Sequence, residues 1–352
     1  MKFTKNIQTH TTVKHGGPYS ISGYNNKILD FSSNVNPLGY PNTVRLDIKK
    51  ISTYPDHHST KLKQVLAKYL KISENNLVIG NGATEIIYDF CRATIRSTKV
   101  LIAAPTFGEY EAASKLCGAK LDFFPTLNLQ NDLKKFIQQI PTNGIVFVCN
   151  PNNPTGELLS KKSVIQIINA AKSRSSLVFV DECFIELTQT PNQSVVRLVS
   201  KFDNLFVLRS LTKSFGLAGL RLGYGIGNKI LIDVLNKIKI PWSVNGLAHQ
   251  AGIGALSDKK FLAKTRKLIK FESRFLTNSL SNLGFFCLDT KTNFILIKTK
   301  QPAKLLQKKL LQKNILVRDC SNFKGLNTHY IRIAIRTNQE NKKLISAFEA
   351  IS

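Results

Sequence analysis

The sequence predicts an α/β protein with a buried parallel sheet and crossover helices, followed by a smaller α+β domain. Residues 56–240 alternate helical periodicity with short apolar runs rich in β-formers, a pattern typical of parallel strands joined by helices. The chain has 352 residues, which is longer than a single core usually supports, so a second domain is expected. With 43% hydrophobic and 20% charged residues, its composition is that of a folded globular protein.

Three regions follow one another along the chain. Residues 1–45 have weak periodicity and are rich in Gly, Asn, Ser and Pro, so they are predicted to form an extended arm. The large domain is predicted over 46–245, with a helix around 62–70 and strands at Leu77–Ile79, Val100–Ala103, Ile145–Cys149, Leu177–Val180 and Leu205–Leu208. The small domain is predicted over 246–352, where a long charged amphipathic region precedes short strands around one helix, at Phe285–Leu288, Phe294–Ile297, Leu316–Arg318 and Tyr330–Ile335.

The formal net charge of +28 raises the question of a nucleic-acid partner. The densest basic stretches, 259–270 and 298–313, have helical spacing with apolar residues between the charges, which favours solvated helix faces. The sequence contains no zinc pattern, RNP-like aromatic motif or arginine-rich arm. We therefore expect no nucleic-acid partner, and we note that a positive field also attracts small anionic substrates.

The cysteines and the hydropathy bear on the compartment. The six cysteines form no CxxC pair and mostly have apolar neighbours, which indicates reduced, packed thiols in a cytoplasmic protein. No apolar run reaches the length of a membrane span, so no membrane partner is expected. The first acidic residue is Asp30, but the segment before it has no arginine and no apolar core, so a cleaved leader is not expected.

Polar motifs follow the predicted strands at their carboxyl ends, where open parallel sheets bind ligands. The first is GNGATEII at Gly80–Ile87, a glycine turn before a helix that begins near Ala83. The free amides of Ala83 and Thr84 would suit a phosphate, although such a segment is also simply a turn. The next is the polar turn NPNNPTG, Asn150–Gly156, which turn chemistry alone explains.

Asp181 and Lys213 each follow a predicted buried strand. A buried carboxylate needs a partner, so Asp181 would suit a protonated pyridine nitrogen, although a helix cap or a surface acid is an equally good interpretation. Lys213 lies in RSLTKSFGLAGLRLGYG, where burial near Arg221 would lower its pKa as a Schiff-base lysine requires. Ser210, Thr212 and Arg221 would add phosphate donors. The nearby GYGIG lacks the full dinucleotide-binding pattern and is predicted as a strand.

These pieces in this order resemble the class I and II, fold type I pyridoxal phosphate (PLP) enzymes, nearest to the histidinol-phosphate aminotransferase branch, over essentially the whole chain. The resemblance implies a mostly parallel seven-stranded sheet in the large domain and PLP as the cofactor. It also implies that Lys213 is the Schiff-base lysine and Asp181 the partner of the pyridinium nitrogen. The other implied cofactor contacts are Asn153 of NNPTG to the phenolic oxygen, Phe107 of PTFGEY to the ring, and Ala83, Thr84, Ser210, Thr212 and Arg221 to the phosphate.

Two further residues bear on this resemblance. Tyr54 of STYPDHH matches the tyrosine that reaches the cofactor phosphate of the partner subunit, which implies a homodimer. Phe184 departs from the pattern, because many relatives carry a tyrosine three residues after the aspartate. The hydrogen bond that this tyrosine makes to the phenolic oxygen is therefore not expected here.

The two ends of the chain resemble the threonine-phosphate decarboxylases of cobalamin biosynthesis, through HGG at 15–17, DFSSNVNPLG at 30–39 and RDCSNFKGLNTHYIRIAIR at 318–336. The resemblance implies decarboxylation of O-phospho-L-threonine, an anionic amino-acid phosphate, to (R)-1-aminopropan-2-yl phosphate. The implied substrate-binding residues, some of them in the arm, are His15, Gly16, Gly17, Asn34, Arg318 and Arg332. Aminotransferases also bind an anion at the position of Arg332, so a histidinol-phosphate or related PLP aminotransferase is the alternative. HGG is also compatible with a merely flexible arm.

Overall fold

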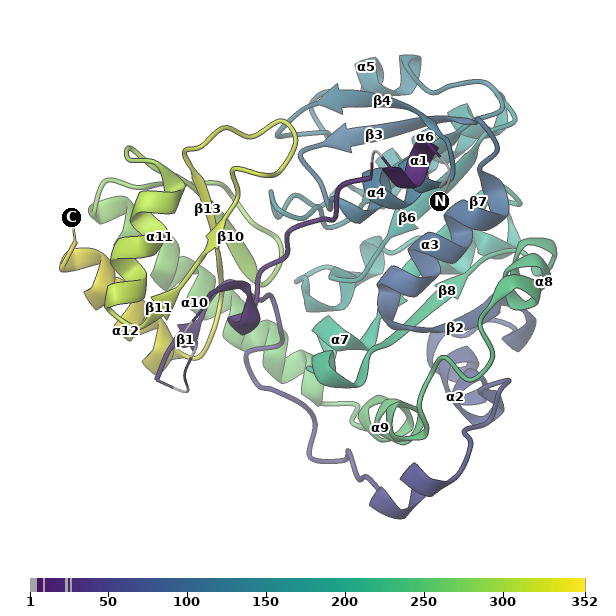
Figure 1. Ribbon diagram of the computed structural model, residues 1–352, viewed down its shortest axis with the longest axis horizontal. Coiled ribbons are helices and arrows are strands. Elements are labelled where there is room, and N and C mark those ends of the chain that lie inside the picture. Colours follow the sequence, from purple (N-terminus) through teal and green to yellow (C-terminus); the bar gives the residue numbers. More distant parts are fainter. Residues whose placement is uncertain (1–4, 9, 23–24, 26, 352) are drawn as a thin grey trace.

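A seven-stranded sheet forms the centre of the larger part of this computed structural model (Figure 1). The structure describes residues 5–8, 10–22, 25 and 27–351. The strands lie in the order β2-β8-β7-β6-β5-β3-β4, and β8 alone runs antiparallel to its two neighbours. Their bounds are β2 Leu77–Asn81, β3 Lys99–Ala104, β4 Lys120–Pro125, β5 Ile145–Cys149, β6 Leu177–Asp181, β7 Leu205–Ser210 and β8 Leu222–Ile226. The predicted mostly parallel seven-stranded sheet is confirmed.

Helices cover both faces of this sheet, because alternate residues of each strand point to opposite sides. Val146 and Val148 of β5 belong to the core beneath α2 (Thr60–Leu70), α5 (Leu133–Gln138) and α6 (Lys161–Lys172). Ile145 and Phe147 of the same strand belong to the core beneath α3 (Gly82–Thr94), α4 (Glu109–Leu116) and α8 (Lys229–Ile238). The sheet is therefore buried on both sides, which explains its nearly continuous apolar strands.

The smaller part contains a four-stranded antiparallel sheet in the order β12-β13-β10-β9. The strands are β9 Phe286–Cys287, β10 Phe294–Lys298, β12 Arg318–Asp319 and β13 Tyr330–Ala334, and the helices are α10 Phe261–Asn282, α11 Ala303–Gln312 and α12 Asn338–Glu349. Helix α9 (Gly246–Ser257) begins at position 246, where the small domain was predicted to start. It contacts α2 and β8 of the larger part, and α10 then leads into the smaller part.

The N-terminal arm joins the two parts of the molecule. Strand β1 (Leu29–Asp30) pairs in parallel with β11 (Ile315–Leu316), so the arm is tied to the smaller part. Further upstream, α1 (Lys5–Gln8) contacts α4 of the larger part. Figure 1 shows the segment between them, in dark purple, crossing from one part to the other. Residues 1–4, 9, 23–24 and 26 of the predicted arm lie outside the described residues.

Strand β4 and helix α12 are among the elements that were not predicted from the sequence. Strand β4 has exposed residues at every second position up to Asp122, only Phe124 is buried, and it ends at Pro125 at the edge of the sheet, so it lacks a continuous apolar run. Helix α12 carries a capping box in which the Thr337 and Glu340 side chains satisfy each other's backbone amides. That T-x-x-E spacing is a recognisable helix start and would have revealed α12.

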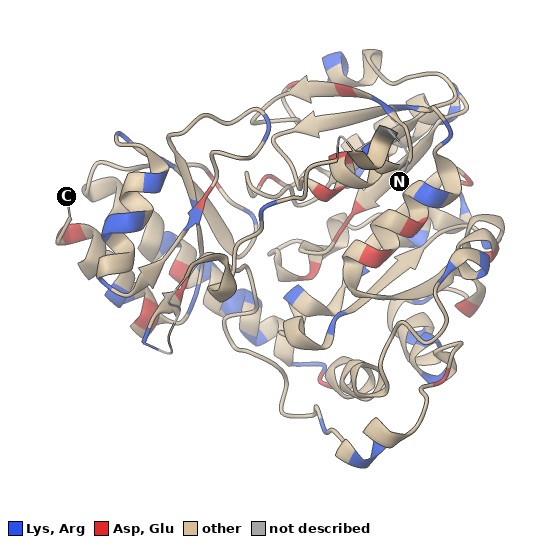
Figure 2. Cartoon of the chain, in the orientation of Figure 1, with Lys and Arg blue, Asp and Glu red and all other residues tan. Residues whose placement is uncertain are grey.

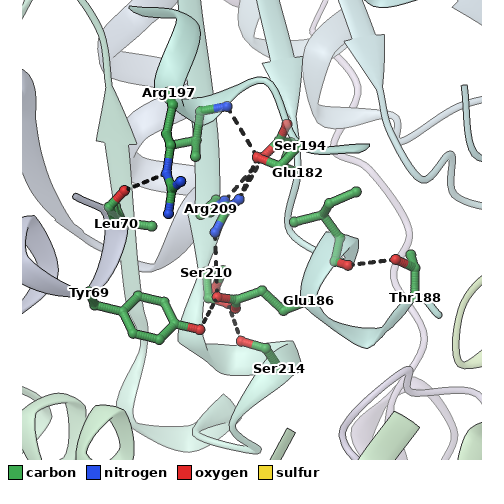
Figure 3. A network of polar contacts seen from close by, with 12 residues as sticks. Tyr69, Leu70, Glu182, Glu186, Thr188, Ser194, Arg197, Arg209, Ser210 and Ser214 are labelled. Atoms are coloured by element: carbon green, nitrogen blue, oxygen red, sulfur yellow. Dashed lines mark hydrogen bonds and ion pairs between the residues drawn. The ribbon is translucent and has the colours of Figure 1, made fainter. Parts of the chain in front are cut away.

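A buried ion cluster fixes the carboxyl ends of β6 and β7 (Figure 3). Arg209 Nη2 and Nε lie 2.9 Å and 3.1 Å from Glu182 Oε2, and Arg209 Nη1 lies 3.4 Å from Glu186 Oε1. Tyr69 of α2 donates to Glu186 Oε1 at 2.8 Å, so the helix is attached to the same cluster. Burial opposes the charge of Arg209, but the carboxylate of Glu182 raises its pKa above the ordinary value. The buried guanidinium of Arg209 therefore remains charged and is paired with both carboxylates.

The basic residues are spread along the chain. Figure 2 shows Lys and Arg on helices and loops of both parts of the molecule, with acidic residues interspersed but fewer. Among the residues that the structure describes, no helix has the length and apolarity needed to cross a membrane.

We expect Glu182→Gln to lower the free energy of unfolding by about 3–5 kcal/mol, because it leaves the buried guanidinium of Arg209 short of its main counter-charge. Urea unfolding of the cofactor-free protein measures this loss. Asp233→Asn is the matched control, since it removes the carboxylate of an exposed helical pair with Lys229 and should cost less than about 1 kcal/mol. Equal losses in the two variants would contradict a stabilising role for the cluster.

Candidate active site

One cavity of about 480 Å³ opens at the carboxyl ends of the central strands, between the two parts of the molecule. Its size is typical of a small-molecule site. The predicted site residues that line it are His15, Gly16, Asn34, Ala83, Thr84, Phe107, Asn153, Asp181, Ser210, Thr212, Lys213, Arg221, Arg318 and Arg332. Gly17 and Tyr54 do not line it.

Lys213 reaches the cavity from the short helix α7 (Leu211–Ser214), which directly follows β7. The hydroxyl of Ser210 caps this helix by accepting from the amide of Thr212 at 3.2 Å. Burial first, and then the positive charges of Arg332 and Arg221, lower the pKa of Lys213 to about 8. The predicted fall in pKa therefore occurs, but Arg332 contributes more to it than Arg221.

Asp181 ends β6, is buried, and lines the same cavity as Lys213. Its Oδ2 accepts from the hydroxyl of Tyr110 at 2.6 Å, and its Oδ1 accepts from the amide of Cys183 at 2.8 Å. Burial raises the pKa of this carboxyl, although the two hydrogen bonds oppose the rise. Within the described part of the chain, Asp181 has no cation at ion-pair distance. It is a buried acid suited to a positively charged ligand atom.

The start of α3 forms a corner rich in hydrogen-bond donors. Asn81 precedes this helix and gives it no side-chain cap, so its first amides, including those of Ala83 and Thr84, have no intrahelical acceptor. The hydroxyls of Ser210 and Thr212 lie 2.6 Å apart in the same corner. Gly82 has φ +80, and a Cβ there would lie 2.5 Å from Arg221 Nη2, so the guanidinium packs against bare backbone. Such a corner fits a phosphate group.

Between this corner and the mouth, the cavity has aromatic and amide walls. Phe107 lines one side, and the Asn153 side-chain oxygen accepts from Arg332 Nη1. Phe184 also lines the cavity and packs edge-on against Phe294, with ring centroids 5.1 Å apart. A phenyl ring at this position offers no hydroxyl to a ligand, in agreement with the departure noted in the sequence.

Two arginines lie side by side on the wall that the smaller part contributes. Arg318 of β12 and Arg332 of β13 are direct register partners. Arg332 donates to the carbonyl of Ser32 at 2.9 Å, and its buried Nε has no partner among the residues that the structure describes. Arg318 donates to the carbonyl of Lys14 at 2.6 Å and to Asn322 Oδ1 at 2.9 Å. Burial, with a smaller contribution from the charge of Arg318, lowers the pKa of Arg332 to about 10.

The arm closes the remaining side of the cavity. His15 Nε2 lies 2.6 Å from Glu109 Oε1 on α4. The amide of Gly17 donates to Ser32 Oγ at 2.8 Å, so this predicted anion donor is occupied within the arm. Asn34 is buried, and its Oδ1 has no partner. Tyr54 is 85% exposed on the outer surface, with its ring 5.2 Å from that of Trp242.

The contacts of this cavity fit PLP together with an anionic substrate. A buried amine, a buried unpaired carboxylate and a cluster of phosphate donors surround one space, and the unpartnered Nε of Arg332 remains available to a second anion. Sequence reasoning missed the residues that support this set, above all Tyr110 and Glu109. Tyr110 lies three residues after Phe107 in PTFGEY, a spacing that places both on one face of a helical turn.

Residues 26–348 match the family described as aminotransferase class I and II. A protein of Caldanaerobacter subterraneus that is provisionally named a threonine-phosphate decarboxylase is 37% identical over 346 residues, which cover 96% of this chain and 94% of that protein.

Two solved structures have similar folds. The histidinol-phosphate aminotransferase of Clostridium acetobutylicum has a TM-score of 0.84 and 32% identity, covering 92% of this chain and 99% of its own. The L-threonine-O-3-phosphate decarboxylase of Porphyromonas gingivalis has a TM-score of 0.82 and 29% identity, with the same coverage. The chain is thus similar over nearly its whole length to enzymes named for two different reactions.

We expect cofactor-free protein to capture PLP covalently at Lys213 with a rate that rises up to about pH 8 and then levels off. The reason is that only the neutral amine reacts, and burial lowers its pKa to about 8 from the ordinary 10.5. Borohydride trapping at a series of pH values measures the rate. Arg332→Met should move the inflection to higher pH, because it removes the largest repelling charge. An inflection near pH 10.5, or trapping on another lysine in Lys213→Ala, would refute the assignment.

Proposed function

The chain belongs to the class I and II aminotransferase family, whose cofactor is PLP, and on this basis we propose that it decarboxylates O-phospho-L-threonine to (R)-1-aminopropan-2-yl phosphate and carbon dioxide. One observation carries the choice of reaction. Arg318 and Arg332 lie next to each other on the cavity wall. Their guanidinium groups donate hydrogen bonds to carbonyl and amide oxygens rather than to carboxylates. The substrate of the proposed reaction has two anionic groups, and two free guanidinium charges would hold them.

The residues around the cavity would hold the cofactor in a defined orientation. Lys213 would bind it covalently, and Asp181 would keep a proton on the ring nitrogen. The amides at the start of α3, with Ser210, Thr212 and Arg221, would hold its phosphate, while Phe107 and Asn153 would contact the ring and its oxygen. When bound, PLP withdraws electron density from the substrate Cα and so weakens the bonds to that atom.

The anchoring arginines would determine which of those bonds breaks. Of the two arginines, Arg332 has the larger effect on the pKa of Lys213, so we assign it to the carboxylate, which is attached directly to the reacting carbon. Arg318, together with His15 of the arm, would then hold the phosphate. Such anchors would turn the carboxylate perpendicular to the cofactor ring, where its bond to Cα is the weakened one.

Loss of carbon dioxide leaves Cα in need of a proton. We assign this proton to Lys213 Nζ, which the substrate amine would by then have displaced from the cofactor. The pKa of about 8 of the free amine keeps it mostly protonated at neutral pH while still able to give the proton up. The buried position of this amine shields the transfer from bulk water. Decarboxylation thus uses one lysine in two roles, as cofactor anchor and as acid.

Histidinol-phosphate aminotransferase activity is the second candidate, and the fold similarity to the Clostridium acetobutylicum enzyme favours it. It would move an amino group between histidinol phosphate and an oxoacid without releasing carbon dioxide. Histidinol phosphate carries one anionic group, so the first half of that reaction would leave one of the two arginines unused. Incubation with O-phospho-L-threonine, while carbon dioxide and oxoacid are both followed, separates the two activities.

We further propose that the enzyme is a cytoplasmic homodimer. The 3-10 segment Ile48–Ser52 and the segments around it expose a group of large apolar side chains: Leu46, Ile48, Ile51, Tyr54, Ile240 and Trp242. Patches of this kind are typical of protein interfaces. Six free thiols suit a reducing compartment, and the strong positive charge would attract an anionic substrate rather than a nucleic acid.

We expect Arg318→Ala and Arg332→Ala each to reduce kcat/KM for O-phospho-L-threonine by roughly tenfold to a hundredfold, because each removes a charge-assisted contact to the substrate. The covalent cofactor at Lys213 should remain. The double variant should lose less than the product of the two factors, since the anchors act as a unit. Carbon dioxide release and cofactor absorbance provide the two measurements.

Arg274→Ala, on the exposed side of α10, is the control and should behave as the wild type does. If both anchor variants keep wild-type turnover, the arginines do not bind the substrate. If the wild-type protein transfers an amino group from histidinol phosphate and leaves O-phospho-L-threonine untouched, the decarboxylase proposal fails while the family assignment stands.

We expect Tyr54→Phe to weaken PLP retention in the dimer, because the tyrosine hydroxyl would contact the cofactor phosphate of the neighbouring subunit. Cofactor affinity measured against protein concentration tests this, with sedimentation recording the oligomeric state. A fully active monomer whose affinity is unchanged by the substitution would contradict the proposal.

A further inference from the structure

Glu109 is a buried carboxylate to which the predicted cofactor and substrate contacts assign no role. It begins α4 and is 5% exposed. Its Oε1 lies 2.6 Å from His15 Nε2, and its Oε2 accepts from the hydroxyl of Tyr88 on α3 at 2.7 Å. Burial raises the pKa of this carboxyl. The hydrogen bonds from His15 and Tyr88, together with the electrostatic effects of His15 and His10, lower the pKa by more than burial raises it, so the net shift is downward. Glu109 is therefore ionised at neutral pH.

An ionised Glu109 decides which hydrogen atoms the ring of His15 carries. A carboxylate only accepts hydrogen bonds, so Nε2 must be the donor in this contact. In a neutral ring Nδ1 would then be an acceptor, which cannot bind an anion. His15 can contact an anion only when both nitrogens are protonated, and the negative charge of Glu109 compensates for that form.

The position of the pair relates it to the substrate rather than to the cofactor. The His15 side chain is 52% exposed and lines the mouth of the cavity, whereas that of Glu109 is only 7% exposed behind it. The preceding residue, Lys14, offers its carbonyl to Arg318 at 2.6 Å, so the same stretch of arm supports the neighbouring anchor. His15 and Arg318 thus border one region of the cavity, and Glu109 is at ion-pair distance from His15.

We propose that Glu109 is a positioning residue for the phosphate of the substrate, acting by keeping His15 oriented and doubly protonated as a second cation beside Arg318. This inference rests on the proposed function, because it takes the substrate to be a phosphate ester. Tyr88 completes the unit by holding the other oxygen of Glu109. Glu109 itself does not line the cavity, so its effect must pass through His15.

A double-mutant cycle on the holoenzyme tests this coupling. Glu109→Gln keeps a hydrogen-bond acceptor for Nε2 but removes the charge, and it should raise KM for O-phospho-L-threonine about tenfold or more with little change in kcat. His15→Asn should do the same. The double variant should be no worse than His15→Asn alone, because Glu109 has no effect without its histidine. Cofactor content should stay at the wild-type level in all three variants.

The phosphate dependence separates this role from a purely structural one. Inhibition by inorganic phosphate should weaken in parallel with KM, whereas competition by L-threonine, which lacks the phosphate, should not change. Glu109→Asp, which withdraws the charge from His15 by one methylene, replaces Glu109→Gln in the cycle if that variant does not fold. Additive losses in the double variant, an unchanged KM, or equal effects on L-threonine and the phosphate ester would overturn the proposal.

Failure of the proposed function can be recognised separately. If the wild-type enzyme uses histidinol phosphate instead, the decarboxylase proposal fails, and the same cycle is run with histidinol phosphate against histidinol. If the variants raise KM for histidinol phosphate but not for histidinol, the role of Glu109 is still supported. If they raise KM for neither compound, that role is rejected for both substrates.

Discussion

The ion pair between Arg209 and Glu182 holds together the two strand ends on which the active site depends. Glu182 follows Asp181, and Arg209 precedes Ser210, so each member of the pair is next to a residue that lines the cavity. Alternate residues of a strand face opposite sides of the sheet. The ion pair therefore lies on the side away from the cavity, while Asp181 and Ser210 face the cavity. A slip of one residue in β7 would exchange these faces and place the buried arginine in the cavity.

The cavity keeps its positive charge because its arginines are held by neutral acceptors. Arg332 donates to the carbonyl of Ser32 and Arg318 to that of Lys14, both in the arm. Carbonyls orient a guanidinium without cancelling its charge, so the full attraction for an anion remains. The same uncancelled charge of Arg332 lowers the pKa of Lys213, which couples the substrate anchor to the reactivity of the lysine. Glu109 follows the opposite arrangement, because its negative charge is needed to maintain a positive one on His15.

Much of this organisation could be predicted because it depends on local sequence. Apolar strands that end in polar turns located Asp181 and Lys213, since the carboxyl ends of parallel strands converge in space. Strand β4 was missed because an edge strand needs no continuous apolar run, and α12 was missed although its capping box was present. Tyr110 and Glu109 could not be assigned, because their roles depend on partners 71 and 94 positions away in the chain. The dominance of Arg332 over Arg221 likewise depends on tertiary structure, because Arg332 and Lys213 come from distant parts of the chain and line one cavity.

The pairing of β1 with β11 places a constraint on the order in which the protein is assembled. Leu29 pairs with Ile315, which is synthesised 286 residues later (315 − 29). At ribosomal rates of about 5–20 residues per second, the arm waits on the order of tens of seconds for this strand. All strands of the large sheet are complete well before then, since β8 ends at Ile226. The lysine and the aspartate are therefore synthesised well before the two arginines, and the substrate pocket cannot be complete until most of the chain has left the ribosome.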